Sequence, residues 1–150
     1  MRARSIWLAI LLGGVVAGTI DIGAAALITG RGVVFILHVI AGGVIGKTAA
    51  FSGGIGTAVL GLLLQWAMAI LIAAIYVLGT RTRPVIYQMW VPSGIVYGII
   101  VFFVMNYVVV PLSAYHRLPK FTTAGFAENM AAMLLFGLII AFFARRRSIR

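Results

Sequence analysis

The stretch TAVLGLLLQWAMAILIAAIYVL, residues 57–78, contains no charged side chain. A helix of about 20 such residues is long enough to cross the roughly 30 Å hydrocarbon core of a bilayer. Three further stretches lack lysine and arginine over a similar length, at residues 6–29, 92–111 and 126–144. Backbone groups in lipid must be paired internally, and these runs do not alternate in polarity, so helices are favoured over a barrel. We therefore predict an all-α membrane protein, a four-transmembrane-helix bundle in one integral-membrane domain over residues 1–150.

The composition of the rest of the chain agrees with this fold class. Hydrophobic residues make up 63% of the sequence and charged residues only 9%, which is too little polar surface for a soluble domain of this size. The net charge of +10 comes from cations that lie at the ends of the apolar stretches, without a basic face interleaved with aromatic residues. The expected partner is therefore the lipid bilayer and not a nucleic acid.

The cations also predict an orientation. If the amino terminus is cytoplasmic, eight of the twelve lysines and arginines fall on the cytoplasmic side of the four spans. Cytoplasmic loops of membrane proteins carry an excess of positive charge, so we expect both termini in the cytoplasm. The residues on that side would be Arg2, Arg4, Arg81, Arg83, Arg145, Arg146, Arg147 and Arg150.

The apolar segment between the first two spans, residues 33–45, is too short to cross a bilayer. As a helix it would reach only about 20 Å at the usual rise of ~1.5 Å per residue. We predict a short helix there that is either interfacial or re-entrant, with Gly42, Gly43 and Gly46 supplying the bend. The sequence leaves both positions open.

Small residues mark the faces on which the spans are expected to pack. Helical spacing aligns a polar side chain with small residues in three spans: Asp21 with Gly14 and Gly18, Gln65 with Gly61, and Asn106 with Gly94 and Gly98. Small residues let membrane helices approach closely, so these glycines are predicted packing positions and the polar groups are expected to face the interior.

The only two acidic residues, Asp21 and Glu128, both lie inside apolar spans. A carboxylate at membrane depth is costly and marks a functional position by default. We hypothesise one polar cluster in the outer half of the bundle, with His38 or Lys47 as a charge partner; its members are Asp21, Gln65, Asn106 and Glu128. The alternative is separate local roles, in which Glu128 complements the start of its helix, Asn106 bridges two helices and Asp21 is protonated or touches interfacial water.

Other motifs give little support for catalysis or cofactors. AGGVIGKT at residues 41–48 fits a relaxed phosphate-loop pattern, but a nucleotide site needs a preceding strand and an acid for magnesium, so no nucleotide is expected. The absence of cysteine removes thiolate metal sites and covalent haem attachment. No metal-spaced His/Glu motif and no Ser/His/Asp set appears, so we predict no metal, no catalytic residue and no enzyme activity.

Three motifs carry a resemblance to a known family. They are AGTID at residues 17–21, GIVYG at residues 94–98 and MNYVVVPLSA at residues 105–114. In this order they resemble small bacterial inner-membrane proteins of the YagU-like kind. The resemblance implies a bacterial inner (plasma) membrane and four helices, without an established activity.

These observations favour a small, non-enzymatic inner-membrane protein that acts as an accessory or structural subunit, as a homo-oligomer or with a membrane-protein partner. The alternative is a proton-linked small transporter or channel component that uses Asp21 and Glu128, with Gln65 and Asn106 along the route. A second alternative is a haem or quinone site at His38, although an ordinary hydrogen bond from an interfacial histidine is the simpler interpretation and no cofactor is predicted.

Overall fold

The computed structural model describes residues 3–148, and these residues form helices joined by short connections, with no strand among them. Four of the helical segments are long and apolar enough to cross a membrane, as predicted. They are α1 (Ala3–Thr29), α4 (Gly54–Thr80), α8 (Thr123–Ser148), and α6 (Trp90–Val104) with its continuation through a π-helical turn, η1 (Met105–Val109), and α7 (Val110–Leu112). Each segment extends beyond the predicted apolar run at one or both ends. The added residues include glycines, threonines and arginines in α4, α8 and α1, and Trp90, Val91 and Leu112 in the third segment.

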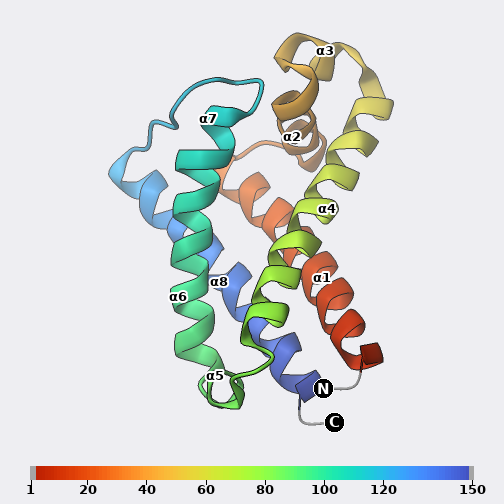
Figure 1. The fold of residues 1–150 in the computed structure, drawn as a ribbon. Coiled ribbons are helices and arrows are strands. Elements are labelled where there is room, and N and C mark those ends of the chain that lie inside the picture. Colours follow the sequence, from red (N-terminus) through yellow and green to blue (C-terminus); the bar gives the residue numbers. More distant parts are fainter. Residues whose placement is uncertain (1–2, 149–150) are drawn as a thin grey trace.

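The four long segments pack in the order α6, α8, α1 and α4 (Figure 1). Glycines allow this close packing. A Cβ atom at Gly14 on α1 would lie 2.6 Å from the Cα of Ile70 on α4, and one at Gly98 on α6 would lie 2.5 Å from the carbonyl oxygen of Met133 on α8. Real Cβ atoms essentially never come so close to backbone, so only glycine fits at these two contacts.

The other predicted packing glycines also lie at helix contacts. Gly18 faces Ala69 of α4, Gly94 faces Leu138 of α8, and Gly61 faces the backbone of Leu37 in α2 (Val33–Ile45). The predicted helix at residues 33–45 thus has the predicted bounds, and it packs against α4 and α1.

Short elements close the two ends of the bundle. α2 and α3 (Lys47–Ser52) lie at one end, and Gly46 separates them with a φ of 87°, a left-handed conformation that favours glycine. α5 (Pro84–Gln88) lies at the opposite end, near the first residues of α1 and the last residues of α8 (Figure 1). We refer to these as the α2 end and the α5 end.

Large apolar side chains cover the outside of the bundle. Leu27 is 85% exposed, Ile55 is 84% exposed and Leu112 is 78% exposed, whereas the most buried positions among the long helices are mainly alanines. Exposed apolar surface of this extent is unfavourable in water and suits contact with acyl chains. The distribution of side chains is therefore that of a membrane protein.

Candidate functional site

A cavity of about 340 Å³ lies among α1, α2, α4, α6 and α8, towards the α2 end. In Figure 1, α4 and α6 approach each other where α5 connects them and diverge towards α2. Most of the lining is apolar. The polar side chains that line it come from α1, α4, η1 and α8, and they are Asp21, Thr29, Gln65, Asn106 and Asn129. We call this space the Asp21 cavity.

Asp21 and Gln65 form a direct contact across the α1–α4 interface. The Nε2 of Gln65 donates a hydrogen bond of 2.8 Å to the Oδ2 of Asp21. Helical spacing places these side chains on the same faces as Gly14 and Gly18 of α1 and Ala69 of α4, where the two helices touch. The donor is a neutral amide, and no lysine, arginine or histidine is among the described residues that line the cavity. The carboxyl group therefore has a polar neighbour but no neutralising cation.

The two asparagines of the cavity each bond to a backbone carbonyl group of their own helix. The Nδ2 of Asn106 donates to the carbonyl oxygen of Phe102 at 2.9 Å, and the Nδ2 of Asn129 donates to that of Gly125 at 2.7 Å. Each amide therefore uses one N–H group on its own helix, which leaves its second N–H group and its oxygen for other partners. Together with the carboxyl group of Asp21, these oxygens suit a proton, a cation or a solute rich in N–H and O–H groups.

A π-helical turn places Asn106. The N–H of Val110 bonds to the carbonyl oxygen of Met105, five residues earlier, where an α-helix would use a partner four residues earlier. Pro111 follows directly, and proline has no N–H and clashes with the carbonyl group four residues before it. A widened turn relieves this conflict, and such turns are frequent at functional sites.

Three of the six residues predicted as one cluster line the cavity, namely Asp21, Gln65 and Asn106. The structure places the other three elsewhere. Glu128 is exposed, Lys47 is exposed and lines a different pocket, and the Nε2 of His38 is 2.8 Å from the carbonyl oxygen of Gly54.

Asn129 lines the cavity in the place expected for Glu128, and the sequence reasoning missed it. Met133 and Phe136 follow it on the same helical face and also line the cavity, so the spacing of these residues was the available signal. The prediction followed the charge of Glu128 instead of this spacing.

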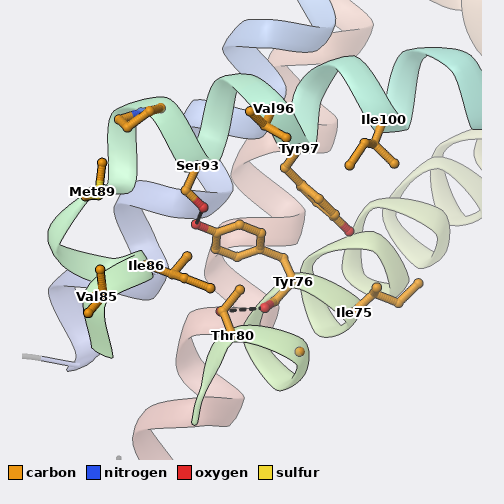
Figure 2. Close-up of a pocket in the computed structure, with 12 residues that line it drawn as sticks. Ile75, Tyr76, Thr80, Val85, Ile86, Met89, Ser93, Val96, Tyr97 and Ile100 are labelled. Atoms are coloured by element: carbon orange, nitrogen blue, oxygen red, sulfur yellow. Dashed lines mark hydrogen bonds between the residues drawn. The ribbon is translucent and has the colours of Figure 1, made fainter. Parts of the chain in front are cut away.

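A second space, the α4–α6 hollow, has a volume of about 540 Å³ and lies nearer the α5 end. Figure 2 shows Tyr76 of α4 reaching across it, with its hydroxyl 2.8 Å from the Oγ of Ser93 on α6. The hydroxyl of Tyr97, on α6, donates to the carbonyl oxygen of Ile72 at 2.6 Å, and the two tyrosine rings are 4.9 Å apart. Ile72 lines the Asp21 cavity, so the tyrosine pair marks the border between the two spaces.

Comparisons of the chain with protein-family models, with curated proteins and with solved structures find no match. What the protein does must therefore be inferred from its own residues.

Proposed function

We propose that this chain is a small proton-linked transporter or channel component, with Asp21 as the group that carries the proton. The observation that supports this best is the Asp21 cavity, in which a carboxyl group bonded to Gln65 faces amide side chains from two further helices. Ionisable residues within membrane bundles are rare because they are costly, and they typically mark proton or ion pathways. Glu128, exposed on α8, has no part in this proposal.

The gap between α4 and α6 supports a route along the bundle. Residues 65–72 of α4 include the lining of the Asp21 cavity, and residues 75–80 include that of the α4–α6 hollow, so the two spaces follow one another along the same helix. Tyr76 and Tyr97 stand between them. We propose that movement of this pair opens the passage, because the two tyrosines join α4 to α6 through the hydrogen bonds of their hydroxyl groups.

The membrane placement is part of the same proposal. Six of the eight arginines predicted on the cytoplasmic side belong to segments at the α5 end, whereas Arg2 and Arg150 lie outside the described residues. The six are Arg4, Arg81, Arg83, Arg145, Arg146 and Arg147. The excess of cations supports a cytoplasmic α5 end, with both termini in the cytoplasm. We therefore place α2 at the outer interface of a bacterial inner membrane, as the YagU-like resemblance implies.

A subunit role is the second candidate. The α4–α6 hollow is lined mainly by apolar side chains, among them Ile75, Val85, Val96 and Ile100 (Figure 2). An apolar helix of a second copy or of a partner subunit would bury this surface. For His38, whose ring already contacts the carbonyl group of Gly54, we propose an ordinary structural hydrogen bond and no haem or quinone site.

Reconstitution tests the first proposal against the second. The purified chain is placed in liposomes with a trapped pH indicator, an inward proton gradient, and a potassium gradient that compensates the charge carried by the protons. We expect these liposomes to acidify faster than liposomes without protein. The reason is that the Asp21 carboxyl group would transfer protons across the cavity. Equal rates in the two kinds of liposome would contradict proton conduction by the chain on its own and favour the subunit role.

A further inference from the structure

A pocket of about 440 Å³ at the α2 end gathers positive charge. It adjoins the Asp21 cavity, with which it shares Val39 and Val110, but its charged lining residues belong to it alone. Arg31 comes from the connection between α1 and α2, Lys47 from the start of α3, and Arg117 from the connection before α8. None of the described residues that line this pocket is acidic. Three cations from separate segments thus face one space without a carboxylate to neutralise them.

Aromatic rings hold two of these cations in place. The Cζ of Arg31 lies 4.4 Å from the centre of the Phe35 ring, and the Cζ of Arg117 lies 5.6 Å from that of Tyr115. Phe51 packs against Phe35 with the ring centres 5.2 Å apart. A guanidinium group stacked on an aromatic face keeps its N–H groups at the edge, where they can donate to an anion.

The connection that carries Arg117 is anchored to α2. The hydroxyl of Tyr115 donates to the carbonyl oxygen of Val39 at 2.8 Å, and the N–H of Ala114 donates to that of Gly43, also at 2.8 Å. Burial raises the pKa of the Tyr115 hydroxyl, against the opposing effect of the Arg117 charge, so the phenol stays protonated and keeps this bond. The pocket is therefore built by tertiary contacts and not only by free side chains.

We propose that this pocket binds a phosphate group, and that in the membrane the phosphate belongs to an anionic lipid headgroup. The three segments that carry the cations lie just beyond the apolar spans, which end at Thr29 and Leu112 and begin again at Gly54 and Thr123. Headgroups lie at this level of a bilayer, and arginine is well suited to paired hydrogen bonds with phosphate. This proposal does not depend on proton transport through the Asp21 cavity.

The test uses the full chain in nanodiscs of phosphatidylcholine to which phosphatidylglycerol is added in steps, with bound lipid counted by native mass spectrometry. We expect Arg31→Gln, Lys47→Gln and Arg117→Gln each to weaken retention of phosphatidylglycerol by about fivefold, the effect of one cation near an anionic surface. Lys120→Gln is the matched control, because Lys120 is exposed on the same connection as Arg117 and is not among the residues that line the pocket. Arg31→Lys keeps the charge but not the stacked guanidinium group, so it should retain more phosphatidylglycerol than Arg31→Gln, which separates loss of charge from loss of folding.

A second arm distinguishes the source of the phosphate. Glycerol phosphate is titrated by calorimetry onto the chain in discs of phosphatidylcholine alone. Retention of phosphatidylglycerol that the three pocket variants weaken, without saturable binding of glycerol phosphate, supports a lipid headgroup. Saturable binding of glycerol phosphate that these variants abolish supports a phosphate site but overturns the lipid as its source. Equal effects of the pocket variants and Lys120→Gln on both ligands would overturn the whole proposal.

Discussion

Asp21→Asn is expected to reduce proton flux into liposomes by about a hundredfold, the lower end of what a positioned proton-transfer group contributes. Asparagine has nearly the same shape as aspartate, and its amide oxygen can still accept the hydrogen bond from the Nε2 of Gln65. The α1–α4 contact should therefore survive, and the variant should insert and fold. An amide, unlike a carboxyl group, does not take up and release a proton near neutral pH. The residual flux should therefore also lose its dependence on pH.

Glu128→Gln provides the control, because it removes the only other acidic side chain of the protein from an exposed position outside the Asp21 cavity. We expect its flux to equal that of the unaltered chain. Fluorescence-detected size-exclusion chromatography checks that both variants remain folded. Normal, pH-dependent flux in Asp21→Asn would show that protons do not pass by this carboxyl group.

Gly98→Ala is expected to destabilise the bundle by about 1–3 kcal/mol, the usual effect of overpacking a tight interface. The added methyl group would meet the carbonyl oxygen of Met133 at 2.5 Å and the Cα of Leu134 at 2.9 Å, and backbone atoms of α8 cannot rotate away. α6 and α8 would have to separate. The free energy of unfolding, measured in bicelles by steric trapping with a pair of bound tags, gives the size of the effect.

Gly79→Ala is the matched control within the same bundle. A Cβ atom at Gly79 would have no heavy atom within 4 Å beyond its immediate neighbours, and Gly79 lies in α4. Alanine should therefore stabilise α4 by about 0.5–1 kcal/mol through its helix propensity. Equal responses at Gly79 and Gly98 would contradict the assignment of packing faces.

The sequence was sufficient for the four long helices and for the polar residues of α1 and α4 that meet at their interface, but not for the inner face of α8. The absence of lysine and arginine over about 20 apolar residues predicts each span from hydropathy alone. Steps of three and four residues from Gly14 to Asp21 and from Gly61 to Gln65 place these polar groups at the α1–α4 interface, as the structure has them. A small-residue stripe and a polar side chain on the same face were thus a usable signal.

The order of the helices could not be predicted in the same way. Three spans carry small-residue stripes, and nothing in their spacing says which stripe meets which. In the structure α6 uses Gly94 and Gly98 against Gly137 of α8, so it does not pack its glycine face on α4. The gap that holds the Asp21 cavity follows from this pairing, which is a tertiary property.

The phosphate pocket proposed at the α2 end could not be predicted from the sequence either. Arg31, Lys47 and Arg117 are far apart along the chain, and each one alone is what the end of a membrane span normally carries. The contacts of Tyr115 and Ala114 with α2 are tertiary, and they bring Arg117 close to Arg31 and Lys47.

The most direct test of the account is whether water reaches the Asp21 cavity inside the bundle. The protein has no cysteine, so a single-cysteine variant carries one thiol. Met68 lines the cavity, whereas Leu71, less than one turn further along α4, is 55% exposed on the outside of the bundle. We expect a water-soluble thiol reagent to label Met68→Cys and to leave Leu71→Cys unlabelled in the membrane. Labelling of Leu71→Cys alone, or of neither variant, would contradict a water-accessible cavity enclosed by helices that face lipid.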